Sequence, residues 1–422
     1  MGTKSSKNED GDDDPSADVG FNDFEVLRSI GKGSFGKVCI VRRKKTENEV
    51  YAMKYMNKLS SWKHGAIDHV LRELEILSTL RHQFLVNLWF TFQDEEDIFM
   101  VSDLLMGGDL RYHIQRHVHF TFDDVRIYFC ELALVLDYLR NKHIIHRDIK
   151  PDNILLDERG HLHLTDFNIA TVLNDEHPCA KSFAGTKPYA APEIFNSSSG
   201  YDYAVDWWSL GVTMYEVLRH KRPFNIGSDT TNEEVTALHN DGSISFPVDW
   251  GQPIMNLFFK LFKVDPTKRI QSFESLISEE FCQNMEADDV MRLKGQPTFQ
   301  PSQKELNYDP TFELEEMIIE SNPLHKKKQR IQKLKKNSQK KKSLKRESCS
   351  EQEEKEEEWE RVMEEIGRKF EPFNRKKLEL AKSLNDTAQN IAQSSDESAV
   401  LNNDSAIPHD DSTNIEAKVE TS

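Results

Sequence analysis

The sequence contains few cysteines and no long apolar run. Its 422 residues include five cysteines, which are scattered and show no C-x-x-C spacing: Cys39, Cys130, Cys179, Cys282 and Cys349. This odd, dispersed set argues against a disulfide framework and implies a reducing compartment. No apolar run approaches the roughly 20 residues that cross a bilayer, and no signal-peptide core follows the first residues. We therefore expect an intracellular, cytoplasmic protein.

Positive charge is also in short supply, because the formal net charge is −17. Acidic residues gather in 8–14 and 351–365, whereas basic residues gather in 326–346. The overall acidity argues against a general affinity for nucleic acid, and we predict no specific nucleic-acid partner. The basic tract has three interpretations, in this order: a solvated or intramolecularly neutralised helix end, a contact with anionic lipid, and a nuclear address.

Two short polar motifs carry the most chemical information. Residues 146–153 read H-R-D-I-K-P-D-N, and residues 166–168 read D-F-N. Asp148 can accept the proton of a hydroxyl, and Lys150 can neutralise a phosphate. Asn153 and Asp166 offer the oxygen ligands that Mg²⁺ prefers. Phosphoryl transfer needs these groups, because its transition state spreads charge over oxygens. A polar loop between two strands is the alternative.

A glycine-rich segment precedes these motifs, and residues 31–38 fit G-x-G-x-x-G-x-V. A β-branched run follows it, which favours a hairpin over phosphates and disfavours the strand-to-helix turn of dinucleotide-binding folds. Lys54 follows in alternating apolar sequence, and Glu73 lies in a stretch with helical periodicity at 68–80. Exposed surface positions are the alternative for both. The candidate nucleotide-binding residues of the hairpin are Ile30, Gly31, Lys32, Gly33, Ser34, Phe35, Gly36, Lys37 and Val38.

Further motifs follow in a fixed order: G-T-K-P-Y-A-A-P-E at 185–193, D-W-W-S-L-G at 206–211 and L-F-K-V-D-P-T-K-R at 261–269. Together with the motifs above, they resemble the eukaryotic protein kinases over residues 24–281. Within that family the sequence is most similar to the AGC group and its YANK family of serine/threonine kinases. The segments that carry this narrower resemblance are 30–41, 51–58, 84–89, 107–113, 166–168 and 309–317.

The resemblance implies an α+β, bilobal protein kinase fold with disordered flanks. It also implies an ion pair between Glu193 and Arg269, and docking of the F-x-x-F motif at 370–373 onto the N-lobe. The expected parts are a flexible acidic leader (1–23), a β-rich N-lobe with one regulatory helix (24–101), a hinge (102–106), a mainly α-helical C-lobe (107–281), a C-terminal extension (282–382) with the basic tract 326–346 and an acidic helix at 351–368, and a disordered tail (383–422).

The function that the resemblance implies is transfer of the γ-phosphoryl group of ATP to serine or threonine hydroxyls of proteins. Mg²⁺ is the expected metal, with Mn²⁺ as an alternative, and we expect a monomer. Asp148, Lys150 and Asn153 are the catalytic residues, and Asn153 and Asp166 are the metal ligands. The remaining nucleotide-binding residues fall into two groups. Lys54 contacts the phosphates and is paired with Glu73. The adenine is surrounded by Ala52, Asp103, Leu105 and Leu155.

Asn168 departs from the general pattern, because most kinases have glycine as the third residue of this motif. Glycine lets the backbone visit positive φ, and asparagine is among the few residues that tolerate that region. An ATP-binding pseudokinase or signalling scaffold is therefore the alternative function.

The first residues, M-G-T-K-S-S, fit the acceptor pattern for myristate on Gly2. One such chain binds membrane weakly and reversibly, so a second signal is needed. We predict weak membrane association through Gly2 and the basic tract 326–346.

Substrate recognition and regulation are also suggested by the resemblance. Asp109, Asp152 and Glu216 align with positions that recruit arginine in basophilic AGC relatives. Ser182 lies where many kinases carry an activating phosphate that meets Arg147. An unmodified polar loop residue is the alternative for Ser182.

Overall fold

The computed structural model describes residues 19–32, 36–44, 46, 49–195, 200–304, 307–308 and 350–387. They belong to two units. The larger, Asp18–Phe373, holds both lobes; of the smaller, Met1–Ala17 with Asn374–Ser422, only 374–387 are described. None of the helices in these ranges is both long and apolar enough to span a bilayer. The predictions on Gly2 and on 326–346 lie outside the described residues.

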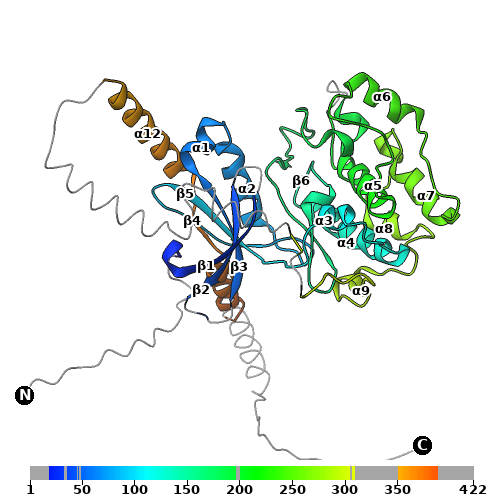
Figure 1. The fold of residues 1–422 in the computed structure, drawn as a ribbon, viewed down its shortest axis with the longest axis horizontal. Coiled ribbons are helices and arrows are strands. Elements are labelled where there is room, and N and C mark those ends of the chain that lie inside the picture. Colours follow the sequence, from blue (N-terminus) through cyan, green and yellow to red (C-terminus); the bar gives the residue numbers. More distant parts are fainter. Residues whose placement is uncertain are drawn as a thin grey trace, which may run out of the picture. The chain divides into compact units, whose positions relative to one another are not determined.

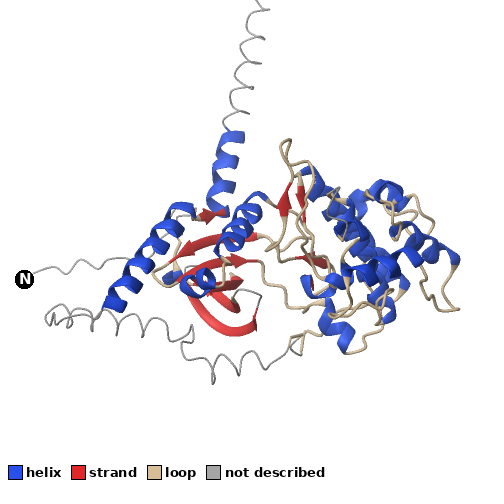
Figure 2. Ribbon diagram, turned by 90° about the horizontal axis from the view of Figure 1, so that it is seen from above, coloured by secondary structure: helices blue, strands red, loops and turns tan. Residues whose placement is uncertain are grey.

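Five antiparallel strands form the N-lobe sheet in the order β1-β2-β3-β5-β4. One face covers an apolar cluster that includes Phe24, Met53, Phe90 and Phe99, all buried. β-branched and aromatic residues at alternate positions explain why these segments are strands. Their bounds are β1 (Phe24–Lys32), β2 (Lys37–Arg43), β3 (Val50–Asn57), β4 (Leu88–Gln93) and β5 (Asp97–Ser102), and Figures 1 and 2 show them gathered in one lobe.

A short turn that precedes residue 24, the predicted start of the N-lobe, packs on the N-lobe sheet. It is a 3₁₀ turn, η1 (Phe21–Asp23), and the ring of Phe21 stacks on Phe99 with centroids 5.3 Å apart. The last residues of the predicted acidic leader thus pack on the sheet, through a contact with Phe99 that lies far from them in sequence.

The N-lobe contains a short helix in addition to the predicted one. The predicted helix is α2 (Ile67–Thr79), which buries Ile67, Val70 and Leu74. It is preceded by α1 (Lys58–Lys63), where the side chain of Asn57 accepts a hydrogen bond from the backbone N–H of Ser60 over 3.1 Å. Six residues are too few to show helical periodicity, and this N-cap was the available signal.

The C-lobe is mainly helical, as predicted. Its central helices α4 and α5 pack against each other and contribute to one large core, in which Trp207 and Trp208 are fully buried. Thr121 and Asp124 form a capping box that starts α4. The helices are α3 (Leu110–Gln115), α4 (Phe122–Asn141), α5 (Ala204–Arg219), α6 (Asn232–Asp241), α7 (Gln252–Leu261), α8 (Phe273–Ile277) and α9 (Ala287–Met291), and the short strands are β6 (Ile144–Ile145), β7 (Ile154–Leu156), β8 (Leu162–Leu164) and β9 (Thr171–Val172).

The expected ion pair between Glu193 and Arg269 is present. The guanidinium donates to both carboxylate oxygens over 2.6 and 2.9 Å, and the Arg269 side chain is fully buried. Its donors also reach the backbone carbonyls of Ala204 and Lys263. A buried charge with this many partners is costly to leave alone, so this pair holds the C-lobe together and takes no part in chemistry.

The acidic helix of the extension is also present, as α12 (Ser350–Lys369). Its apolar residues Val362 and Ile366, with Phe370, are buried in one cluster with Val70 and Leu74 of α2. The first phenylalanine of the F-x-x-F motif, Phe370, thus packs on the N-lobe, as the resemblance implies. The backbone N–H of Phe373 donates to the hydroxyl of Thr91 over 2.8 Å.

Helical structure continues past the predicted start of the disordered tail at residue 383. A two-residue strand, β10 (Phe373–Asn374), spans the boundary between the two units along the chain, and residues 375–387 are helical. The tail prediction therefore began too early by the five residues 383–387. Lysine, leucine, glutamate and alanine favour helix over 376–382, and the helix extends from there into the polar residues that follow.

Candidate active site

The strand lysine and the helix glutamate meet at the cleft face of the N-lobe sheet. Nζ of Lys54, on β3, donates to Oε1 and Oε2 of Glu73, on α2, over 3.0 and 3.1 Å. Nζ also lies 3.9 Å from Oδ1 of Asp166. Burial alone would lower the pKa of Lys54, but the charges of Glu73 and Asp166 raise it. The lysine therefore keeps its positive charge inside the cleft.

Asp148 lies at the centre of a hydrogen-bonded group. Its Oδ1 accepts from Oγ1 of Thr186 over 2.6 Å, and its Oδ2 lies 2.8 Å from Nζ of Lys150. Lys150 also donates to Thr186 over 2.9 Å. Burial alone would raise the pKa of Asp148, but the hydrogen bonds from Lys150 and Thr186 lower it. The carboxylate is thus ionised near neutral pH and can accept a proton.

The loop that carries Asp148 is held from below by α5. The buried carboxylate of Asp206 accepts the backbone N–H groups of His146 and Arg147, each over 2.8 Å. The ring of His146 packs edge-on against Phe167, with centroids 4.7 Å apart. These contacts fix the catalytic loop and the D-F-N triplet relative to one another.

Two oxygens suited to a hard cation face this group. Nδ2 of Asn153 donates to Oδ2 and the backbone carbonyl of Asp148, each over 2.9 Å, so its Oδ1 is the oxygen that remains for a ligand. Oδ1 of Asp166 is buried and takes part in no hydrogen bond among the described residues. The donor set fits Mg²⁺ held by two side chains and by phosphate oxygens. The described residues contain no cluster of three or more histidine, cysteine or acidic side chains that would bind a metal alone.

A cleft of about 290 Å³ joins these groups to the hinge. Ser102 and Leu104 of the connecting segment add to the wall between the lobes. The predicted site residues that line the cleft are Ile30, Gly31, Val38, Ala52, Lys54, Glu73, Asp103, Leu105, Asn153, Leu155 and Asp166.

The structure separates the hairpin residues into three groups. Ile30, Gly31 and Val38 line the cleft, whereas Gly36 and Lys37 do not. A Cβ on Gly36 would lie 2.5 Å from the backbone oxygen of Tyr55, so this position requires glycine. The third group lies outside the described residues: Gly33, Ser34, Phe35 and the side chain of Lys32.

Comparison with known proteins agrees with this geometry. The protein kinase domain model matches residues 24–282. Serine/threonine-protein kinase 32B of Homo sapiens is 53% identical over 324 residues, which cover 76% of this chain and 78% of the relative. Kinase 32C of Mus musculus is equally similar, and there the match spans 66% of the relative's length. A RAC family serine/threonine-protein kinase homolog of Dictyostelium discoideum is 37% identical over 290 residues, which cover 68% of this chain and 64% of the relative.

The chain belongs to the protein kinase family. The relatives that match it at 53% identity are named serine/threonine-protein kinases, which confirms the resemblance to the YANK family inferred from the motifs. The more distant match to the RAC family homolog agrees with the assignment to the AGC group.

The third position of the triplet, where this kinase has Asn168, does not adopt positive φ. Positive φ in the triplet belongs to Asp166, at 66°. Its side chain is buried, and its Oδ1 has no hydrogen-bond partner in the described part of the chain. Asparagine therefore fills the third position of the triplet while the metal ligand keeps its place in the cleft.

The activation segment of the kinase contacts the catalytic loop. Nη1 of Arg147 donates to Oγ of Ser182 over 3.2 Å, and its Nε donates to the backbone carbonyl of Ile169 over 2.7 Å. Arg147 thus reaches the predicted phosphate site, and modification of Ser182 stays a prediction.

Sequence reasoning missed the roles of four residues around the site. Tyr308, from the C-terminal extension, lines the nucleotide cleft, and Asn307 beside it donates to the backbone carbonyl of Met106 over 2.9 Å. Nothing local connects either residue to a hinge that lies far from it in sequence.

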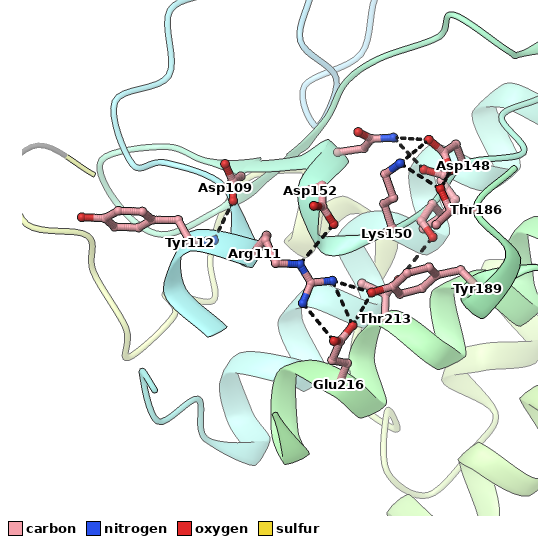
Figure 3. A network of polar contacts seen from close by, with 12 residues as sticks. Asp109, Arg111, Tyr112, Asp148, Lys150, Asp152, Thr186, Tyr189, Thr213 and Glu216 are labelled. Carbon is pink, nitrogen blue, oxygen red and sulfur yellow. Dashed lines mark hydrogen bonds and ion pairs between the residues drawn. The ribbon is translucent and has the colours of Figure 1, made fainter. Parts of the chain in front are cut away.

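The other two missed residues are Arg111 and Tyr189. They join the acidic residues Asp152 and Glu216 next to the catalytic loop (Figure 3). The sequence did contain a signal for the contact between Arg111 and these carboxylates. Arg111 lies two residues after Asp109, and the resemblance had already grouped Asp109, Asp152 and Glu216 at one site.

Proposed function

We propose that this chain is an active serine/threonine protein kinase that uses ATP and Mg²⁺. The observation that supports this most strongly is the assembled catalytic group. Asp148 is ionised and oriented by Lys150, Thr186 and Asn153, while Lys54 is already paired with Glu73. A catalytic constellation that is held before the substrates bind avoids reorganisation during the reaction.

Each residue has a distinct task in this proposal. Lys54 holds the α and β phosphates, and Glu73 keeps its ammonium in place. Asp148 accepts the proton of the attacking hydroxyl, and the hydroxyl of Thr186 donates to the same carboxylate. Lys150 lies beside that carboxylate and can neutralise charge on the γ-phosphate. Bound Mg²⁺, held by Asn153 and Asp166, would supply positive charge against the phosphate oxygens.

The relatives and the loop chemistry support serine and threonine as acceptors. Lys150 reaches across to Thr186 and Asp148 at the point where the acceptor hydroxyl would bind. The pseudokinase alternative rested on Asn168, and it is not favoured. The altered residue leaves Asp166 within reach of Lys54, and the catalytic Asp148 and Asn153 are hydrogen-bonded to one another.

The test is phosphate transfer from radiolabelled ATP with Mg²⁺ to a degenerate library of serine, threonine and tyrosine peptides. We expect label on serine and threonine peptides, and loss of transfer in the matched variant Asp148→Asn. Nucleotide binding without transfer to any peptide would support the scaffold function instead. Label confined to tyrosine peptides would contradict the acceptor assignment.

Membrane association through Gly2 and the basic tract 326–346, a cytoplasmic location and a monomeric state stay predictions of the sequence. Both of these segments lie outside the described residues. Fractionation of the parent chain and a Gly2→Ala variant tests the membrane proposal, which fails if both partition equally between membrane and cytosol.

A further inference from the structure

An arginine of the chain itself is bound to the acidic residues beside the catalytic loop. Nη1 of Arg111 donates to Oε1 of Glu216 over 2.9 Å, and Nη2 donates to Oε2 over 3.3 Å. Nε donates to Oδ2 of Asp152 over 3.2 Å, and Nη2 also donates to the hydroxyl of Tyr189. We call Arg111, Asp152, Tyr189 and Glu216 the arginine cluster. Figure 3 shows Arg111 reaching from α3 into the space between the two carboxylates.

The carboxylate of Glu216 is already hydrogen-bonded within the arginine cluster. The side chain of Glu216 is only 8% exposed, and its Oε2 also accepts the hydroxyl of Tyr189 over 2.5 Å. Burial alone would lower the pKa of Arg111, but its contacts with Glu216, Tyr189 and Asp152 raise it, so the guanidinium stays charged. Both oxygens of Glu216 are therefore bound by donors of the same chain. The two-pronged contact with a planar guanidinium is a strong form of ion pair.

The arginine cluster belongs to the segments that surround the acceptor hydroxyl. Asp152 lies in η2 (Pro151–Asn153), which directly follows Lys150. Tyr189 lies in η3 (Lys187–Tyr189), which directly follows Thr186, the residue that contacts Asp148. Figure 3 shows the cluster beside Asp148, Lys150 and Thr186. A peptide whose hydroxyl reaches Asp148 must therefore pass close to the cluster.

We infer that Arg111 fills this acidic subsite from within, so that the kinase does not select peptides with arginine or lysine near the acceptor residue. This inference rests on the proposed kinase activity and narrows its substrate class to peptides with neutral or acidic flanks. The aligned carboxylates Asp152 and Glu216 suggested the opposite preference, but they are bound to Arg111.

An incoming arginine would have to displace Arg111 to reach Glu216. The displaced guanidinium, whose side chain is 23% exposed in its present place, would give up its contacts with Glu216, Asp152 and Tyr189. The incoming arginine would only replace these contacts, so the exchange adds no ion pair. If Arg111 stayed, the two like charges would repel. The third acidic residue, Asp109, accepts the backbone N–H of Tyr112 over 2.7 Å as the N-cap of α3. It is thus committed to the helix start.

The experiment compares kcat/KM for a serine peptide with alanine flanks and for derivatives with one arginine at each flanking position in turn. For the wild-type chain we expect less than about a threefold gain from arginine at any position. Arg111→Ala should raise the arginine-to-alanine ratio at one or two positions by about tenfold or more, because Glu216 and Asp152 lose their partner. A ratio taken within one variant cancels any general loss of activity.

Two control variants identify the cause. Adding Glu216→Gln to Arg111→Ala should remove most of the gained preference, since of the two carboxylates only Asp152 then remains. Arg116, at the end of the same helix, stacks on the ring of Tyr112, 4.5 Å from its centroid. The control variant Arg116→Ala should therefore keep the wild-type ratio. A strong arginine preference in the wild-type chain would overturn the inference. This outcome does not depend on whether any variant folds.

The same peptides with a fluorescent label separate this inference from the proposed function. If no peptide is phosphorylated, the proposed kinase activity fails, and binding measured by anisotropy still tests the subsite. Tighter binding of arginine peptides to Arg111→Ala than to the wild-type chain supports the inference. Equal binding to both, or tight binding to the wild-type chain alone, overturns it.

Discussion

The nucleotide cleft and the arginine cluster each contain a largely buried carboxylate, and the two carboxylates differ in their hydrogen bonding. In the cleft, Oδ1 of Asp166 is buried and has no hydrogen-bond partner among the described residues. In the arginine cluster, both oxygens of Glu216 are bound by Arg111 and Tyr189. Burying a carboxylate oxygen without a hydrogen bond is costly, so the first arrangement is suited to an external cation and the second to internal stability.

This contrast separates two uses of the same chemistry. In the cleft, Asp166 keeps a carboxylate oxygen that has no hydrogen bond within the described ranges and that a cation arriving with the nucleotide can use, whereas the carboxylates of the cluster are neutralised by Arg111 before any substrate binds. Substitutions in the cleft should therefore affect turnover more than stability, and substitutions in the cluster should do the reverse.

Removing the open carboxylate should have the largest effect. We expect Asp166→Asn to lower kcat by about 10²–10³-fold, because a charged group aimed at the reacting phosphate is lost. The free energy of unfolding should change by less than about 1 kcal/mol, since the ion pair that Asp166 loses is a 3.9 Å contact with Lys54. Steady-state kinetics over a range of Mg²⁺ concentrations and denaturant unfolding measure the two quantities. Loss of stability with full activity would reverse the assignment.

Removing the charge that orients Lys54 should have a smaller effect. Glu73→Gln keeps an oxygen that can accept from Nζ but loses the charge, so we expect the KM for ATP to rise about tenfold in steady-state kinetics. Asp68→Asn is the matched control, because it removes an exposed charge of the same helix that pairs with Nζ of Lys369 over 3.0 Å and does not touch Lys54. A rise in KM for both variants would point to a general effect on α2.

The positions of the cleft residues could be predicted from the sequence because motif spacing is a local property. Lys54, Glu73, Asp148, Asn153 and Asp166 were each identified from short segments, and the structure brings them together. Their chemistry restricts which residue types can serve, so each position is recognisable without knowledge of its neighbours in space.

The sequence did not predict the contacts that depend on how distant segments approach. Arg111 meets Glu216 only because α3 packs near α5, and Tyr308 reaches the cleft from a segment beyond the C-lobe. The helix α1 was missed because six residues carry no periodicity. Side-chain partners across elements are decided by packing, which spacing along the chain does not encode.

Removing the hydroxyl of Tyr189 tests the other half of the comparison. Tyr189→Phe deletes a buried hydrogen bond to Glu216, and we expect the free energy of unfolding to fall by about 1–2 kcal/mol. The Mg²⁺ concentration that gives half-maximal activity should stay the same, because this residue does not line the nucleotide cleft. Denaturant unfolding and Mg²⁺ titration check the two expectations, and a shifted Mg²⁺ dependence would show that the regions are coupled.

The smallest effect should come from Asp109, which lines the cleft and also neighbours the arginine cluster. Burial, with a contribution from Asp152, raises its pKa from 3.8 to about 6, against the hydrogen bond from the backbone N–H of Tyr112. The folded state therefore binds this proton more tightly than the unfolded state, so the carboxylate lowers stability as pH rises from about 4 to 6.

Asp109→Asn removes this titration and keeps an oxygen that can cap α3. The stability of the variant relative to the wild-type chain should therefore increase by about 1 kcal/mol between about pH 4 and about pH 7.5, since partial exposure reduces the full effect of the shift. Denaturant unfolding at both pH values measures the difference. Asp123→Asn, in the first turn of α4 where the carboxylate is 70% exposed, is the matched control. A relative stability of Asp109→Asn that does not change with pH would mean that Asp109 is already ionised at the lower pH, and that burial beside the arginine cluster does not hold its proton.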